Sequence, residues 1–177
     1  EITVTADPGG TPVVIARVSH APGDPDELRI HGSNQRDVIR FTSLDDLAGF
    51  SSLRVRGGGG DDVIDALLAT QHLLLEGNSG NDRIIGSRSG DTLKGGEQND
   101  TLIGGAGNDR LDGGPGDDRL IGNGGLNRMT GRTGDDVFAG GGVNVLAESA
   151  NVNLTLTDAG LSGIGNDIVL APIRRVI

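Results

Sequence analysis

A nine-residue period constrains this chain more than any other feature of its sequence. Between residues 57 and 142, eight units that begin with glycine follow in register, with one interruption at residues 66–76. A fixed period of this length predicts stacked, equivalent structural units in place of one globular core. The units are GGGGDDVID from Gly57, GNSGNDRII from Gly77, GSRSGDTLK from Gly86, GGEQNDTLI from Gly95, GGAGNDRLD from Gly104, GGPGDDRLI from Gly113, GNGGLNRMT from Gly122 and GRTGDDVFA from Gly131.

Each unit divides into a six-residue half rich in Gly and Asp and a three-residue half with an apolar residue at its centre. We number the positions of the unit 1 to 9, so that Gly stands at position 1, the acid at position 6 and the apolar residue at position 8. Polar neighbours at position 7 give the alternation of a strand whose central residue faces inward, and the glycines supply turns with positive φ. Position 8 is held by Ile64, Ile84, Leu93, Leu102, Leu111, Leu120, Met129 and Phe138, and Leu73 is expected there in the irregular unit.

Composition favours a thin core between short strands. Of the 177 residues 32 are glycine, and aromatic residues make up only 2% of the chain, which leaves little material for a thick globular interior. Apolar residues still make up 34% of the chain, too many for a disordered segment, and they recur at regular intervals. The sequence therefore predicts an all-β solenoid.

The charge of the chain indicates a cation as its partner. The net charge is −10, and Asp supplies 20 of the 25 acidic residues, a bias that neither helix propensity nor solubility would produce. Such a chain would repel nucleic acids and anionic membranes, and no apolar run is long enough for membrane insertion. Cysteine is absent, which excludes disulfides and thiolate metal sites.

The units resemble the G-G-x-G-x-D-x-U-x nonapeptide of RTX proteins, the hemolysin-type calcium-binding repeat, over about half of the chain. This resemblance implies a parallel right-handed β-roll or β-helix solenoid with two nonapeptides per coil, flanked by short capping strands. It also implies that calcium lies between consecutive turns on one side, held by Asp carboxylates and turn carbonyls. The resemblance further implies a secreted, bacterial protein.

Two nonapeptides per coil would place residues eighteen apart one above the other, so that the residues at position 6 form two files. The first file needs two extra residues in the coil after Asp62 and seven in the coil after Asp37. The second file ends early, because Val145 stands where the next acid would fall. The predicted metal ligands are Asp37, Asp62, Asp82, Asp100, Asp118 and Asp136 in the first file, Asp91, Asp109 and Asn127 in the second, and Asp167 in the repeat-like unit SGIGNDIVL.

Calcium is the metal that these files favour. Carboxylates one coil apart, at about 4.7–4.9 Å between strands, would repel each other unless a divalent ion lay between them. Calcium takes six to eight oxygens in flexible geometry, whereas magnesium demands a strict octahedron and zinc prefers His or Cys. The three histidines, His20, His31 and His72, are scattered without ligand spacing. We therefore expect several calcium ions, and we expect the acids at position 5 (Asp61, Asp117 and Asp135) to be solvated.

The repeat block divides the chain into three predicted regions. Residues 1–56 are expected to form an N-terminal β cap with one isolated repeat, GSNQRDVIR from Gly32; residues 57–142 the β-roll; and residues 143–177 a C-terminal β cap with a repeat-like unit. The strand-like segments outside the roll are ITVTA, PVVIARV and LRIH before it and VNVLA and NVNLTLT after it. No signal peptide precedes Glu1, so we expect that a secreted form has lost its leader or carries its export signal elsewhere.

These sequence features are consistent with two functions. The first is a calcium-binding extracellular or cell-surface protein with a structural or adhesive role, whose subunits stack head-to-tail into a filament. The alternative is the secretion and folding module of a larger type I-secreted enzyme or toxin, which stays unfolded at low calcium and folds outside the cell. No HExxH, G-x-S-x-G or Walker motif is present, and we expect no enzymatic activity.

Overall fold

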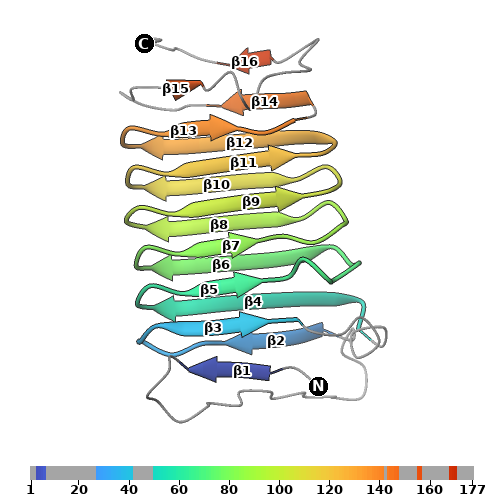
Figure 1. Ribbon diagram of the computed structural model, residues 1–177, viewed down its shortest axis with the longest axis vertical. Helices are drawn as coiled ribbons and strands as arrows, with labels where there is room; N and C mark the ends of the chain where they lie inside the picture. The colour runs from blue at the N-terminus through green and yellow to red at the C-terminus, as the bar shows by residue number, and fades with distance from the viewer. Residues whose placement is uncertain are drawn as a thin grey trace.

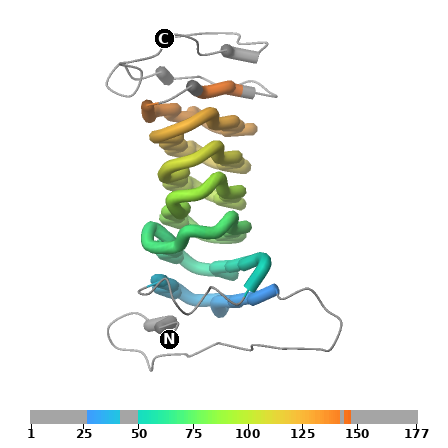
Figure 2. The backbone as a smooth tube through the Cα atoms, turned by 90° about the vertical axis from the view of Figure 1, so that its right-hand side faces the viewer, coloured from blue at the N-terminus to red at the C-terminus, as the bar shows by residue number. Residues whose placement is uncertain are grey.

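The chain forms an all-β solenoid of two eight-stranded sheets whose coils follow one another along the long axis (Figures 1 and 2). The computed structural model describes residues 3–6, 27–41, 50–141, 143–147, 155–156 and 168–170. Odd-numbered strands form one sheet and even-numbered strands the other, because each nonapeptide contributes one strand and two nonapeptides complete a coil. The predicted β-solenoid is thereby confirmed.

The strands of the two sheets alternate along the chain. The odd sheet contains β1 (Thr3–Ala6), β3 (Asp37–Arg40), β5 (Val63–Asp65), β7 (Arg83–Ile85), β9 (Thr101–Gly105), β11 (Arg119–Asn123), β13 (Val137–Ala139) and β15 (Thr155–Leu156). The even sheet contains β2 (Glu27–His31), β4 (Ser52–Gly59), β6 (Leu73–Ser79), β8 (Thr92–Glu97), β10 (Arg110–Pro115), β12 (Leu126–Thr133), β14 (Val143–Ala147) and β16 (Ile168–Leu170).

The strand registers agree with the predicted coil lengths. Leu111 of β10 pairs with Met129 of β12, eighteen residues later. Ile64 pairs with Ile84 and Ile39 with Ile64, so the coils with two and seven extra residues also hold. Every pairing is parallel except that of β1, which runs antiparallel to β3.

The parallel ladder extends beyond residues 57–142 on both sides. β2 pairs with β4 at the N-terminal end, and β14 pairs with β16 at the C-terminal end. The predicted strands ITVTA, LRIH, VNVLA and NVNLTLT each overlap an observed strand, whereas PVVIARV lies outside the described residues. The exact boundaries of the three regions stay predictions.

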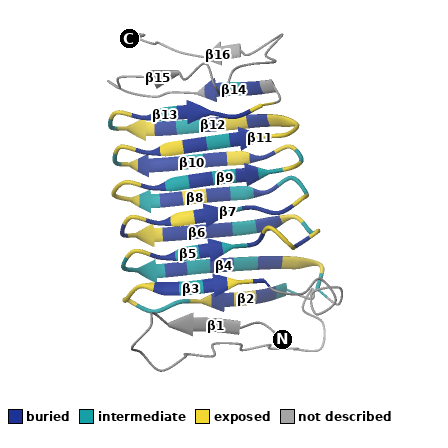
Figure 3. Cartoon of the chain, viewed as in Figure 1, coloured by how far each residue is buried: buried dark blue, intermediate teal, exposed yellow. Residues whose placement is uncertain are grey.

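The core is a ladder of aliphatic side chains between the two sheets. The residues predicted at position 8 are all fully or almost fully buried, and buried positions alternate with more exposed ones along strands such as β9 and β11 (Figure 3). One assignment was wrong: Leu75, not Leu73, pairs with Leu93 at position 8. Leu73 is also buried, but it stands two residues earlier, in the slot that Asp91 takes in the next coil. The two extra residues of the irregular unit lie in the turn before β6. Position 8 of this unit therefore falls two residues later than expected, at Leu75.

Charged side chains are paired on the outer face of the even sheet. Glu76 of β6 accepts hydrogen bonds from Arg54 and Arg56 of β4 and from Lys94 of β8. Burial by itself would raise the pKa of Glu76, but these three cations outweigh it and lower the pKa to about 2.

Among the described residues no helix is long and apolar enough to cross a bilayer.

Candidate metal sites along the turns

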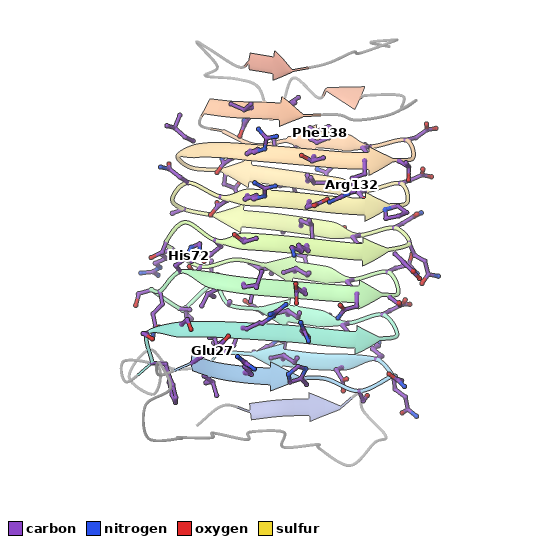
Figure 4. All side chains as sticks on the ribbon, turned by 180° about the vertical axis from the view of Figure 1, so that it is seen from behind. Glu27, His72, Arg132 and Phe138 are labelled. Atoms are coloured by element: carbon purple, nitrogen blue, oxygen red, sulfur yellow. The ribbon has the colours of Figure 1, made fainter. Side chains whose placement is uncertain are left out.

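The two files occupy opposite edges of the solenoid. Turns that lead from an even to an odd strand carry the first file, at the left of Figure 1, and turns that lead from an odd to an even strand carry the second file, at the right. His72 lies at the second-file edge, where its Nδ1 contacts the carbonyl oxygen of Gly90 (Figure 4). We call these the first-file edge and the second-file edge.

The six first-file carboxylates form one continuous stack. Each is at most 2% exposed. The backbone N–H of each member donates to Oδ1 of the next, over 2.7–2.9 Å, from Asp37 through to Asp136. The predicted first file is thus brought together as one row, and Oδ1 of each carboxylate from Asp62 to Asp136 joins its coil to the preceding coil.

The second carboxylate oxygen is left without a donor in most of the stack. Oδ2 of Asp62, Asp82, Asp100 and Asp118 is buried and accepts no hydrogen bond, and the same is true of Asp109 in the second file. A buried carboxylate oxygen without a donor is costly. In the charged form these atoms therefore require a positive partner, which the described part of the chain does not supply.

Backbone carbonyls converge on the same places. A Cβ built on Gly77 would come within 3.0 Å of both Oδ2 of Asp82 and the carbonyl oxygen of Gly95, and a Cβ on Gly95 would meet Asp100 and Gly113 in the same way. Glycine at position 1 therefore keeps a small cradle open between a carboxylate and a carbonyl of the next coil. Two acceptors that face one space with no donor between them are the environment of a hard cation.

Burial raises the pKa values of these carboxyl groups. Desolvation, aided by the neighbouring carboxylates, raises the pKa of Asp100 to about 8 and that of Asp62 and of Asp118 to about 7. Desolvation likewise raises the pKa of Asp82 to about 6. Without a cation, Asp62, Asp100 and Asp118 are therefore at least partly protonated near neutral pH, and an ion that favours the charged form must displace those protons.

The donor set fits calcium better than the metals that prefer side-chain clusters. In the described part of the chain no three His, Asp or Glu side chains gather at one point, so backbone carbonyls must complete any coordination sphere. Calcium accepts such carbonyls in flexible geometry. The residues that would hold it are the position 6 carboxylates and the carbonyl oxygens of the position 1 glycines.

The second file differs from the first at both of its ends. Before Asp91 its slot holds Leu28, Leu53 and Leu73, which pair with one another along β2, β4 and β6. After Asp109 it holds Asn127, whose amide donates to the carbonyl of Gly124 and to Oδ1 of Asn144. An N–H group thus stands at Asn127 where an aspartate would offer an oxygen, and its assignment as a metal ligand stays a prediction.

The second file does not end where the spacing of eighteen placed its end. Asn127 pairs with Asn144 and not with Val145, and Asn144 is buried like the members of the file. The turn after β13 is one residue shorter than a full repeat, which a fixed period cannot anticipate. The sequence signal was the unit AGGGVN, where the polar residue comes one position early. Asp167, the last predicted ligand, lies outside the described residues.

Two turns have a different backbone conformation from the rest. In the seven units that begin at Gly57, Gly77, Gly95, Gly104, Gly113, Gly122 and Gly131, positions 2 and 4 both have positive φ, even where they hold Asn78, Gln98, Asn123 or Arg132. We call these open turns. The units that begin at Gly32 and Gly86 have serine at position 2, and neither position 2 nor position 4 has positive φ there.

In these two turns the serine occupies the carboxylate oxygen that is open elsewhere. The N–H of Ser33 donates to Oδ2 of Asp37 and the N–H of Ser87 to Oδ2 of Asp91, both over 2.5 Å. The hydroxyl of each serine accepts the N–H of the residue two positions later, Gln35 or Ser89. We call residues 32–37 and 86–91 the serine-closed turns; sequence reasoning missed them, although serine at position 2 was their signal.

The acids and amides at position 5 join coils in the opposite direction. Asp61, Asn81, Asn99 and Asp117 are exposed, and Oδ1 of each accepts the backbone N–H of the position 5 residue in the next coil. Their exposure agrees with the prediction that the position 5 acids are solvated. Their hydrogen bonds add a structural role that the sequence did not indicate.

A family model for the RTX calcium-binding nonapeptide repeat (4 copies) matches residues 54–68, 76–111 and 112–144. The matched segments contain every predicted ligand from Asp62 to Asp136, while Asp37 and Asp167 lie outside them. Searches of the curated proteins and of the solved structures found no match.

Proposed function

The chain is an RTX-type calcium-binding nonapeptide-repeat protein, and from this premise we propose that it acts outside the cell as a non-enzymatic structural or adhesive protein whose solenoid folds when calcium fills its turns. The observation that carries the proposal is the row of buried carboxylates from Asp62 to Asp118, each with one oxygen that lacks a donor. A calcium-poor compartment would leave that row unstable, and a calcium-rich exterior would stabilise it.

Calcium would offset the electrostatic cost of burying a row of carboxylates. Burial, and to a smaller extent the neighbouring carboxylates a coil apart, raises the pKa of Asp100, so the charged forms are unfavourable together in a buried row. Calcium binds the folded row and has little affinity for the unfolded chain, in which the carboxylates are separated. It therefore stabilises the folded state in proportion to its occupancy.

Self-association is proposed as the route to a structural role. Parallel sheets end in strands with unpaired backbone groups, which favour pairing with a further strand. β1 lies antiparallel on β3, so the N-terminal edge of the odd sheet is covered by a strand that breaks the parallel repeat. End-to-end contact at that end would therefore involve β1 or the even sheet.

Calcium titration tests the folding part of the proposal. Circular dichroism of the full chain should show little β signal after calcium is removed with a chelator and a cooperative gain of β signal as calcium is returned. Magnesium at the same concentration is the control and should restore less signal. An identical spectrum with and without calcium would contradict the proposal.

Electron microscopy and light scattering test the assembly part separately. Particles that lengthen in calcium and return to single subunits in chelator would support a filament. Monodisperse single subunits at all calcium concentrations would refute head-to-tail assembly while leaving calcium-dependent folding intact.

A further inference from the structure

Each file of carboxylates begins with a serine-closed turn. Asp37 is the first acid of the first file and Asp91 the first acid of the second, and these two are the members whose Oδ2 accepts a backbone N–H from position 2. We propose that Ser33 and Ser87 close these two turns to calcium, so that the ion binds only at the open turns that follow. The inference rests on the proposed function, because it assigns which positions of the files take the ion.

The conformation of position 2 decides whether a turn is open. In the seven open turns this residue has positive φ, and no N–H reaches Oδ2 of Asp62, Asp82, Asp100, Asp109 or Asp118. In the serine-closed turns φ is not positive, and the N–H points at the carboxylate instead. Serine favours this second conformation because its hydroxyl accepts the N–H two residues later. The absence of glycine is not enough, since Asn78, Asn123 and Arg132 hold position 2 of open turns at positive φ.

A cation cannot share the position that this N–H takes. The carbonyl oxygens that would help to hold calcium are still present, since a Cβ on Gly32 would collide with the carbonyl of Gly57 and a Cβ on Gly86 with that of Gly104. What has changed is that a donor hydrogen now faces the carboxylate. A positive dipole end repels a cation at this distance, so calcium would have to rotate the peptide and break the hydrogen bond to enter.

The two serine-closed turns lie where each file of carboxylates begins. Before Asp91 the same slot holds Leu73, which offers no ligand, and its N–H donates to Oδ1 of Asp91 over 2.8 Å. Before Asp37 the odd sheet ends in the antiparallel strand β1. Each closed turn therefore lies at a boundary between coils that carry a carboxylate and structure that does not, where backbone donors replace calcium.

The test compares two matched pairs of substitutions, each with one change at each edge. Asp37→Asn with Asp91→Asn alters both serine-closed turns, and Asp82→Asn with Asp109→Asn alters two open turns. Bound calcium per chain is measured by equilibrium dialysis and elemental analysis at saturating calcium, with circular dichroism to establish folding. The first pair should bind as many ions as the unaltered protein, and the second pair should lose at least one ion.

The outcomes separate this inference from the proposed function. If the unaltered protein binds no calcium, the proposed function fails. If it binds calcium and the Asp37→Asn, Asp91→Asn protein loses as many ions as the Asp82→Asn, Asp109→Asn protein, the function stands and the inference is overturned.

A second variant keeps the inference testable if the first pair does not fold. Ser87→Gly with Ser89→Gly restores glycine at positions 2 and 4 and thus the sequence of an open turn ahead of Asp91. This protein should bind one more calcium ion than the unaltered protein. An unchanged or lower number of ions would show that the serine conformation does not close the turn.

Discussion

The first-file and second-file edges share one backbone plan but fill the same inward slot with different chemistry. At the first-file edge the slot holds a buried aspartate in each coil from Asp37 to Asp136. At the second-file edge it holds leucine up to Leu73, aspartate at Asp91 and Asp109, and asparagine at Asn127 and Asn144. Coils therefore stack with or without carboxylates in this position, and metal dependence is a property of each turn.

Leucine, asparagine and aspartate differ in the partners that their side chains need at this buried position. Leucine extends the apolar core and needs no partner. The Asn127 and Asn144 pair is satisfied by hydrogen bonds between amides and to backbone carbonyls. Aspartate in an open turn has one oxygen left over, and only this solution calls for a cation. The difference between the edges predicts where substitutions will change calcium dependence and where they will change packing alone.

The largest effect is expected from removing carboxylates at the centre of the first file. Asp100→Ala with Asp118→Ala should lower the free energy of unfolding in calcium by about 5 kcal/mol, since each ion bound at a hundredfold excess over its Kd contributes about 2.7 kcal/mol. Urea unfolding in calcium and in chelator measures this effect. The matched control is Asp61→Ala with Asp117→Ala, which removes only exposed position 5 hydrogen bonds and should lower the free energy of unfolding much less. Equal losses in the two proteins would mean that the buried row has no special role.

Replacing a leucine of the second-file edge by aspartate should lower the free energy of unfolding somewhat less. Leu73→Asp removes a fully buried leucine and introduces a carboxylate where Leu68, not glycine, stands five residues earlier. We expect a loss of about 2–5 kcal/mol that calcium does not restore, because no open cradle exists there. Thermal unfolding of Leu73→Asp and Leu73→Ala, each with and without calcium, measures the difference. Recovery of Leu73→Asp by calcium would show that an aspartate alone creates a site.

The pH dependence of stability should reverse when calcium is removed. In the metal-free protein the pKa values of Asp62, Asp82, Asp100 and Asp118 are raised from 3.8 to between about 6 and about 8. The folded state then binds protons more tightly than the unfolded state, so its stability is greatest below about pH 4 and is lost as the pH rises through 6 to 8. With calcium, acidification should weaken the fold, because protons compete with the ion. Melting curves from pH 4 to 8 in both conditions check this, and a metal-free fold that gains stability with rising pH would contradict it.

The smallest effect is expected outside the two edges. Glu76→Gln removes the negative charge that pairs with Arg54, Arg56 and Lys94 on the outer face of the even sheet and should cost about 1 kcal/mol. The loss should be the same with and without calcium and should shrink at high salt. Because the pKa of Glu76 is lowered to about 2, its contribution is present above pH 4.5 and is lost only as the pH falls through 2. A loss of stability that depends on calcium would mean that the ion pairs around Glu76 are energetically coupled to the turns.

The first file could be read from spacing throughout, whereas the second could be read only from Asp91 to Asn127. The spacing of eighteen, with two longer coils, placed Asp37 to Asp136 in one row because parallel strands repeat the register of their neighbours. The same count failed for Leu73 and Val145, since one turn holds extra residues and another lacks one. An insertion or deletion shows in the sequence, but the turn that absorbs it is chosen by how the flanking strands pack.

The amino-acid sequence by itself determined the β-solenoid, the thin aliphatic core and the first row of aspartates, because a nine-residue period leaves few other ways to bury alternating apolar residues. Only the tertiary structure decided which carboxylates still have an oxygen without a donor. That outcome depends on the φ angle of a single residue in each turn and on which backbone N–H it directs at the carboxylate. An aspartate at position 6 is therefore identical in the sequence whether its turn is open, as at Asp100, or closed, as at Asp91.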